Sequence, residues 1–261
     1  IRDRGGIEKI LQEVANYLAA KPDLYDVTIT VLEGPDEGRN LFLSNIKIKG
    51  VFRSSAAYKK WSAAWFWFKL RQLLYCIYLL LGQYDIVLAI KDGWYIKLGA
   101  HMRAKRKIAW VHTAALNSDW ASAFFKSPEE ERTCMAAFDK VICVSDSKRQ
   151  LVLDYSGDPG NLAVCYNPVN AVDIISRAAE EVKLPADSMR PVFVAVNRLV
   201  DVKENIRLLE CVKRLNSKYE FSLWIVGDGE ERENLENYIA ENDLKNVVMS
   251  VSYTHLRAHE T

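Results

Sequence analysis

The sequence has little of what would mark several classes of protein. Its 261 residues carry a net charge of +1, which gives no argument for nucleic-acid binding. Its five cysteines include no C-x-x-C pair, which favours reduced, buried thiols in a cytosolic protein over disulfides. We find no signal peptide, internal repeat or low-complexity segment. With 49% hydrophobic and 26% charged residues, the composition is that of a folded globular protein.

Apolar, strand-like runs alternate with helical segments along most of the chain. Helical spacing of apolar residues predicts helices over 6–20 and 61–81. The strand-like runs are 26–32, 46–52, 85–90, 107–112, 140–145 and 162–167. This alternation predicts an α/β fold with a parallel sheet that is covered on both faces.

The alternation breaks after Asn167-Pro168 and then starts again beyond a polar stretch at 183–191. The second series has strands at 191–196, 221–227 and 246–249 and helices at 204–215 and 230–241. We therefore predict two Rossmann-like domains that face a cleft. The first, 1–168, is expected to lack its first strand, and the second, 169–250, to be truncated.

The last eleven residues, VSYTHLRAHET at 251–261, have no periodicity and break the pattern before them. All eleven match the translation of a transposon-derived adapter used in preparing sequencing libraries. We therefore expect a non-native tail and a protein fragment. His255 and His259, whose spacing would suit a metal pair, are set aside for the same reason.

Two short motifs of the first domain lie where a ligand could reach them. Gly5 and Gly6 open the first helix, where free N–H groups favour an anion, although a cap or tight turn explains them equally well. His112 ends the strand of the W-V-H-T motif. It is a candidate for the mouth of the cleft, with a hydrogen-bonded structural histidine as the alternative.

Two further motifs follow strands of the second domain. V-N-R-L-V-D-V-K contains Arg198 and Lys203, whose planar fork and compact charge could stabilise a leaving diphosphate. Two solvated surface cations are the alternative. I-V-G-D-G places Gly227 in a turn whose backbone could face a nucleotide, or a plain turn in which Asp228 caps the next helix.

Together these motifs resemble glycosyltransferase family 4, a group of retaining GT-B enzymes. The resemblance rests on their order along the chain: Gly-Gly, W-V-H-T, F-D-K-V-I-C-V-S at 138–145, Y-N-P-V at 166–169, R-L-x-x-x-K, and I-V-G-D-G-x-E-R-x-x-L ending at Leu235. It spans almost all of the chain up to Met249. The pairing of R-L-x-x-x-K with G-D-G is its most specific part.

The resemblance implies sugar transfer from a nucleotide-sugar donor to a glycan or lipid-linked glycan, with retention of configuration. This is the chemistry of polysaccharide or cell-surface glycan biosynthesis. The resemblance implies no metal, no cofactor beyond the donor, and no nucleic acid. Carried over by position, it implies His112 as the catalytic candidate and a substrate-binding set of Gly5, Gly6, Asn197, Arg198, Lys203 and Gly227.

Three departures from the family pattern stand out. Asn197 stands where the family usually has glycine before the arginine, and Glu204 where it often has glycine after the lysine. Both loosen the expected geometry of the phosphate loop. The family's later Glu-rich donor motif would lie beyond Met249.

Two questions stay open at the level of sequence. The segment 61–81 is interrupted by Lys69 and Arg71, so it suits either a buried helix or an interfacial helix at the inner face of a membrane. A non-catalytic relic that binds a nucleotide or a partner protein is the alternative function. A nicotinamide-dependent oxidoreductase is disfavoured because no G-x-G-x-x-G follows a suitable strand.

Overall fold

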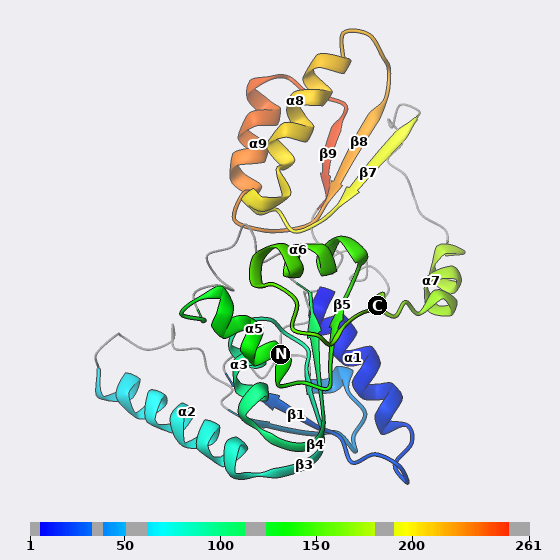
Figure 1. The fold of residues 1–261 in the computed structure, drawn as a ribbon. Helices are drawn as coiled ribbons and strands as arrows, with labels where there is room; N and C mark the ends of the chain where they lie inside the picture. The colour runs from blue at the N-terminus through cyan, green and yellow to red at the C-terminus, as the bar shows by residue number, and fades with distance from the viewer. Residues whose placement is uncertain (1–5, 33–38, 51–61, 113–123, 181–190, 251–261) are drawn as a thin grey trace. The chain divides into compact units, whose positions relative to one another are not determined.

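A computed structural model describes residues 6–32, 39–50, 62–112, 124–180 and 191–250. The chain divides into two compact units, Ile1–Ala171 and Val172–Thr261 (Figure 1). Every strand pairing in the described ranges is parallel. Parallel neighbours need crossover connections, and this confirms the α/β class predicted from the alternation. The domain boundary expected at residue 168 stays a prediction.

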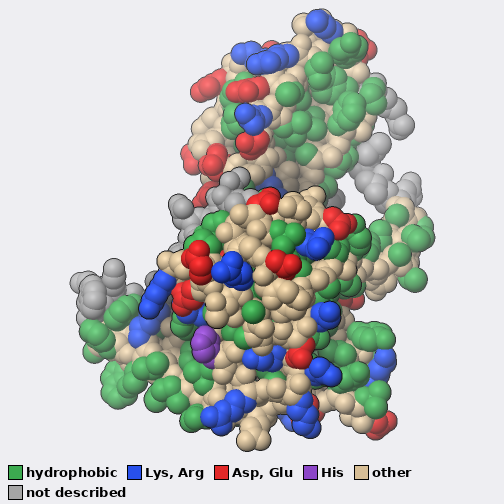
Figure 2. Space-filling view, in the orientation of Figure 1, with side chains coloured by type: hydrophobic (Ala, Val, Ile, Leu, Met, Phe, Trp, Pro, Cys, Tyr) green, Lys and Arg blue, Asp and Glu red, His purple; other side chains and the backbone are tan. Residues whose placement is uncertain are grey.

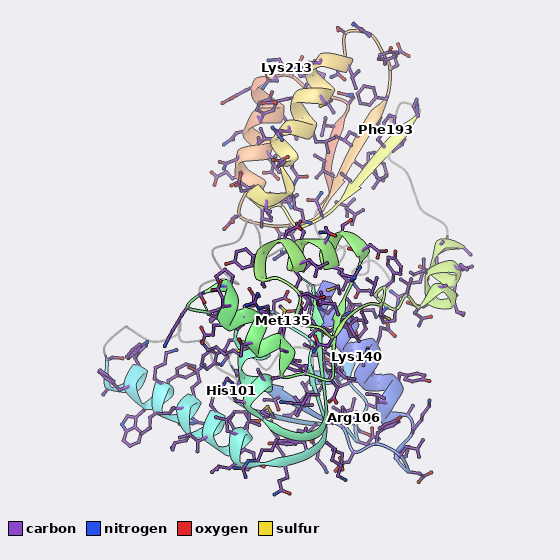
Figure 3. The ribbon with its side chains drawn as sticks, in the orientation of Figure 1. His101, Arg106, Met135, Lys140, Phe193 and Lys213 are labelled. Atoms are coloured by element: carbon purple, nitrogen blue, oxygen red, sulfur yellow. The ribbon has the colours of Figure 1, made fainter. Side chains whose placement is uncertain are left out.

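The larger sheet of unit 1 has four strands in sequence order: β3 (Gln83–Ala89), β4 (Arg103–Val111), β5 (Lys140–Cys143) and β6 (Leu162–Val164). The helices that connect these strands are α3 (Trp94–His101), α5 (Pro128–Ala136) and α6 (Asp146–Ser156). A buried apolar cluster lies between the sheet and these helices and includes Ile96, Ala109, Met135, Val141 and Cys143. Met135 reaches into it from α5 (Figure 3).

Serine caps fix where two of these helices begin. The Ser127 hydroxyl accepts from the N–H of Glu130 at 3.3 Å, with Pro128 at the first helical position of α5. The Ser145 hydroxyl accepts from the N–H of Lys148 at 3.1 Å and starts α6 directly after β5. The second cap places the first turn of α6 at the carboxyl end of the sheet.

A second, smaller sheet of unit 1 pairs β1 (Thr28–Val31) with β2 (Lys47–Gly50). Helix α1 (Gly6–Ala19) packs on it through Ala15 and Ala19, beside the short helix η1 (Arg39–Leu41). The amide of Asn16 ties α1 to the segment after η1. It donates to the carbonyl of Leu41 and accepts from the N–H of Leu43, each at 3.0 Å.

Helix α2 (Ala63–Leu81) begins at Ser62, whose hydroxyl accepts from the N–H of Trp65 at 3.2 Å. Only Phe68, Cys76 and Leu79 of this helix are buried. Its exposed large side chains are Phe66, Trp67, Leu70, Leu73, Leu74, Ile77, Tyr78 and Leu81. Figure 2 shows hydrophobic side chains gathered over α2, at the lower left. The alternative of a buried helix is therefore wrong for this face. None of the helices in the described ranges is long and apolar enough to cross a membrane.

Unit 2 has the parallel sheet β7 (Val192–Val196), β8 (Ser222–Val226) and β9 (Val247–Ser250), in that order. Helices α8 (Asn205–Leu215) and α9 (Arg232–Glu241) lie side by side on one face of it (Figure 1). The core between them contains Leu209, Val212, Leu223, Ile225 and Leu235. Phe193 on β7 remains exposed (Figure 3). Helix α7 (Ala171–Ala178) begins at the unit boundary.

The five cysteines are all free thiols, as predicted, but they are not all buried. Cys76, Cys134 and Cys143 are buried, whereas Cys165 and Cys211 are exposed. Cys165 follows β6, the edge strand of its sheet, and Cys211 lies between the inward-facing Leu209 and Val212 of α8. The prediction of five buried thiols is wrong for these two because apolar neighbours in sequence do not bury a residue at a sheet edge or on the outer face of a helix.

Candidate functional site

In unit 2, two loops continue side by side beyond the carboxyl ends of β7 and β8. The N–H of Asn197 donates to the carbonyl of Val226 at 3.2 Å, and the N–H of Leu199 donates to that of Asp228 at 2.9 Å. The N–H of Glu231 returns a bond to the carbonyl of Leu199 at 3.0 Å. The V-N-R-L and G-D-G motifs therefore form one hydrogen-bonded platform. From the sequence alone they were interpreted as two separate turns.

Close backbone approach explains both glycines of this platform. A Cβ atom at Gly227 would lie 1.9 Å from the carbonyl oxygen of Asn197. One at Gly229 would lie 2.1 Å from the carbonyl oxygen of Leu199. No side chain fits at either position, because real Cβ atoms do not approach backbone so closely. The candidate ligand residue Gly227 thus has a structural role in packing the two loops together.

Asn197 pairs with Asn205, the first residue of α8. Its Nδ2 donates to the Oδ1 of Asn205 at 3.1 Å, and the Nδ2 of Asn205 donates back to its Oδ1 at 2.9 Å. Asn205 is buried at 5% exposure. The amide that replaces the family's usual glycine therefore anchors the start of α8 to the end of β7. Sequence reasoning missed Asn205, although an Asn-x7-Asn spacing across a loop was a usable signal.

Arg198 and Lys203 lie on the segment held between these anchors. Leu199, next to Arg198, is fully buried, while Lys203 ends the short helix η4 (Asp201–Lys203). Both cationic side chains are exposed, and neither is bonded or ion-paired to another described residue. Two positive charges thus project from a loop that is fixed by backbone bonds and by a buried leucine.

Glu204 follows Lys203 in the left-handed region, with φ of 50° and ψ of 37°. A residue with a side chain is strained there, which gives a physical reason for the glycine that the family often has at this position. The Glu204 carboxylate accepts from Nη1 of Arg207 at 2.9 Å. The chain keeps the loop conformation that glycine favours while using a charged residue.

Asp228 does not cap the following helix. Its Oδ1 accepts from the N–H of Gly229 at 3.0 Å, and α9 begins at Arg232, with Glu231 before it and no side-chain cap. The alternative of a capping aspartate is therefore wrong. The carboxylate is used instead inside the turn, whose place is already set by the backbone bonds to Leu199.

In unit 1, His112 directly follows β4, and three of its atoms define its setting. Its backbone N–H donates to both carboxylate oxygens of Asp92, at 3.2 and 3.1 Å. Ring Nδ1 lies 3.1 Å from the carbonyl oxygen of Trp110, which can only accept, so Nδ1 carries the hydrogen. Nε2 is buried and has no hydrogen-bond partner among the described residues. In the uncharged tautomer with its hydrogen on Nδ1, the acceptor lone pair lies at Nε2.

Gly6 is the exposed first residue of α1, and a Cβ atom there would meet nothing within 4 Å. No packing in the described structure requires glycine at that position. Gly5 lies outside the described residues. Gly6 and His112 belong to unit 1, whereas Asn197, Arg198, Lys203 and Gly227 belong to unit 2.

Unit 1 also buries three charged side chains that sequence reasoning missed. They are Asp92, Glu131 and Lys148, at 4–5% exposure. Burial raises the pKa of Glu131 and lowers that of Lys148. No group of three or more potential metal ligands occurs in the described ranges. Of these three buried charged residues, only Asp92 had a signal in the sequence, because it lies just beyond a predicted strand.

Two family models match the chain. Glycosyltransferase Family 4 matches residues 4–172, and Glycosyl transferases group 1 matches residues 176–257. The second match runs into the segment expected to be non-native, which lies outside the described residues. No curated protein sequence matches significantly.

Several solved structures share the fold at low identity. The lipopolysaccharide outer core galactosyltransferase WaaB is 18% identical, with a TM-score of 0.61 over 95% of this chain and 64% of its own. Anabaena HepE in complex with UDP and glucose is 14% identical, with a TM-score of 0.64 over 95% of this chain and 66% of its own. A Rickettsia africae glycosyltransferase is 17% identical, with a TM-score of 0.58 over 95% and 65%.

This chain therefore spans about two thirds of the length of these structures. The fold agrees with the two-part family match, which covers first one unit and then the other. Each motif quoted from the sequence falls inside the matched ranges. The chain belongs to glycosyltransferase family 4 and has the GT-B fold.

Proposed function

We propose that the whole protein transfers a sugar from a nucleotide-diphosphate donor to a glycan or lipid-linked glycan, with retention of configuration. The observation that carries the proposal is the pair Arg198 and Lys203. Both are exposed and unpaired within the described structure, on a loop fixed by Leu199 at the carboxyl end of β7. In open α/β sheets, ligands bind at this end of the strands.

The two cations have complementary chemistry for a leaving diphosphate. As the bond from the anomeric carbon to the phosphate oxygen breaks, negative charge develops on the phosphate. The guanidinium of Arg198 can donate two parallel hydrogen bonds, and the ammonium of Lys203 adds a compact charge. Because backbone bonds hold the loop before substrate arrives, little reorganisation is needed as charge develops.

Unit 1 supplies the other half of the proposal. Nε2 of His112, which has no partner among the described residues, can accept a hydrogen bond from a hydroxyl of the reacting sugar. Gly5 and Gly6 are proposed to let donor phosphates or acceptor approach the start of α1, and at Gly6 nothing within 4 Å requires glycine for packing. Asn197 and Gly227 are proposed to act on the donor indirectly, by shaping the loop that carries Arg198.

Proteins of similar fold give this proposal its substrate class. HepE structures contain UDP with glucose and UDP-glucose, and a TarM structure contains UDP. WaaB is by its title a galactosyltransferase of the lipopolysaccharide outer core, which makes a lipid-linked glycan the acceptor class to try first. The domain boundary is proposed near residues 168–172, between the acceptor-side and donor-side halves.

The test is turnover by the full-length protein with UDP-, GDP- and ADP-sugars and short glycan or glycolipid acceptors. The anomeric configuration of the product is read by NMR. Transfer with retention supports the proposal, and inversion contradicts it. Nucleotide binding without transfer or donor hydrolysis would favour a non-catalytic relic of the same fold.

We also propose that α2 docks the protein on an anionic membrane surface, at the inner face of the cell membrane. At about 100° per residue, its eight exposed large side chains fall on one arc of the helix. Lys69 and Arg71 lie at the two edges of that arc, and α2 contains no acidic residue. An apolar stripe bordered by cations is typical of interfacial helices. It would bring the protein to a lipid-linked acceptor.

Flotation with phosphatidylglycerol and phosphatidylcholine vesicles tests the docking of the full-length protein. Wild type should float with the anionic vesicles, and Trp67→Ser with Leu74→Ser should not. Tyr219→Ser, which removes an exposed aromatic ring from unit 2, is the matched control and should float normally. Flotation of the double variant at wild-type level would exclude α2, as would self-association through α2 in sedimentation without any vesicle binding.

A further inference from the structure

All three charged side chains that are buried within the described ranges belong to unit 1. They come from different elements. Asp92 follows β3, Glu131 is on α5, and Lys148 is in the first turn of α6. Charged groups are rarely buried unless they are compensated, so such a gathering calls for a physical reason.

The hydrogen bonds of this group are unequally distributed. The Asp92 carboxylate accepts from the backbone N–H of His112, at 3.2 and 3.1 Å. Glu131 Oε2 accepts from the hydroxyl of Ser156 at 3.1 Å. Lys148 Nζ is fully enclosed and has no hydrogen-bond partner in the described structure. No hydrogen bond within the described residues therefore compensates its buried ammonium.

The charges that act on Lys148 show which groups its own positive charge compensates. Burial lowers the pKa of Lys148, and the charge of Asp92 is the largest effect that opposes burial. Glu131 also opposes it, while burial raises the pKa of the facing Cys143 thiol and keeps that thiol uncharged. For Glu131, burial raises the pKa, Lys148 opposes this, and Asp92 adds to it. The charge of one ammonium thus acts on two carboxyl groups.

We propose that Lys148 is a positioning residue: its buried ammonium is the counter-charge for the carboxyl groups of Asp92 and Glu131, and it thereby holds the Asp92 carboxylate against the backbone N–H of His112. Ring Nδ1 of His112 is bonded to the Trp110 carbonyl, so the direction of Nε2 follows the backbone at position 112. Lys148 thus determines the direction in which Nε2 of His112 points, without contacting substrate itself.

Only the last step, in which the orientation of Nε2 affects sugar transfer, rests on the proposed function. The balance of charge between Lys148 and the carboxyl groups of Asp92 and Glu131 belongs to unit 1, and it can be measured without donor or acceptor. Failure of the charge balance and failure of the enzyme assignment are therefore distinguishable. A protein that does not transfer sugar could still show the balance, and an active enzyme could lack it.

The test uses backbone hydrogen exchange in the full chain, followed at His112 and at Val141. Val141 is a fully buried β5 residue whose N–H bonds to the Asn161 carbonyl at 3.1 Å, so it reports on overall folding. Lys148→Met should speed exchange at His112 about tenfold or more, and Asp92→Asn should do so too. Lys148→Arg, which keeps the charge, should remain near wild type.

A charge-restoring variant separates the proposal from a merely structural role. Lys148→Met with Glu131→Gln removes one charge of each sign and should return His112 exchange close to wild type. If Lys148→Met alone fails to fold, folding of this double variant with a protected His112 supports the proposal. In Lys148→Met, the pKa of Glu131, read from its carboxyl carbon signal, should rise further, because the opposing charge of Lys148 is gone. Unchanged His112 exchange in Lys148→Met, or no rescue by Glu131→Gln, would overturn it.

Discussion

Gly229 lies so close to Leu199 that a Cβ atom at Gly229 would be 2.1 Å from the Leu199 carbonyl oxygen. Gly229→Ala should therefore separate the two loops and destabilise unit 2 by about 1–3 kcal/mol, as overpacking does. Urea unfolding followed by circular dichroism measures the change. Gly6→Ala is the matched control, because a Cβ atom at Gly6 meets nothing within 4 Å. The stability of this variant should not fall below that of wild type. Equal stability of the two variants would contradict the close approach.

The reciprocal amide pair of Asn197 and Asn205 should be energetically coupled. Asn205→Ala leaves the half-buried Asn197 amide without its partner, which costs about 1–3 kcal/mol. In a double-mutant cycle, the cost of removing both amides should be smaller than the sum of the two single costs, with a coupling of at least about 0.5 kcal/mol. Additive single effects would show that the pair does not anchor α8.

Replacing Glu204 with glycine should relieve strain. Its φ of 50° disfavours any residue with a side chain, while glycine gains flexibility in the unfolded chain, so Glu204→Gly should stabilise by up to about 1 kcal/mol. Glu204→Ala is the matched control, since it loses the same contact with Arg207 but keeps the strain. A glycine variant no more stable than the alanine variant in urea unfolding would refute strain at this position.

Asp139 should make the stability of the folded protein depend on pH. Its carboxylate accepts from the backbone N–H of Lys107 at 2.7 Å and pairs with Arg106 at 3.1 Å, and these bonds hold its pKa below the ordinary value of 3.8. A lowered folded-state pKa gives stability that is present above the unfolded value and lost as pH falls through the folded one. Asp139→Asn should therefore lower the Tm at pH 7.

The difference in Tm between Asp139→Asn and wild type should shrink as the pH falls below 3.8. Scanning calorimetry at pH 7, 5 and 3 measures it. Lys140, the next residue in sequence, begins β5 with its side chain exposed (Figure 3), and within the described residues it makes no ion pair with this carboxylate. Lys140→Gln is thus a control whose effect should not follow the same course. A constant difference for Asp139→Asn would contradict the account.

Local patterns predicted most of the fold, because strands and helices are encoded by periodicity. The helix expected over 61–81 runs over Ala63–Leu81, and the strand expected at 140–145 is Lys140–Cys143. Burial was predicted less well. Apolar residues on α2 and the thiol of Cys165 are exposed, since burial depends on what packs against a segment and sequence periodicity does not specify that.

The candidate site was predictable only in part, and for the same reason. Arg198 and Lys203 follow a strand directly, so their place at the carboxyl end of β7 could be predicted. The burial of Lys148 with Asp92 and Glu131 could not, because those three residues meet only through long-range packing. The strain at Glu204 could be suspected from the family's glycine but needed the backbone angles.

The central claim is that Arg198 and Lys203 hold the diphosphate, and calorimetry of nucleoside diphosphate binding to the full-length protein tests it most directly. Arg198→Ala and Lys203→Ala should each weaken binding about tenfold or more, as expected when a charge-assisted hydrogen bond is lost. Lys213→Ala removes an exposed cation from the last turn of α8 and should leave affinity unchanged (Figure 3). Unchanged affinity in both loop variants, or equal losses in all three, would contradict the claim.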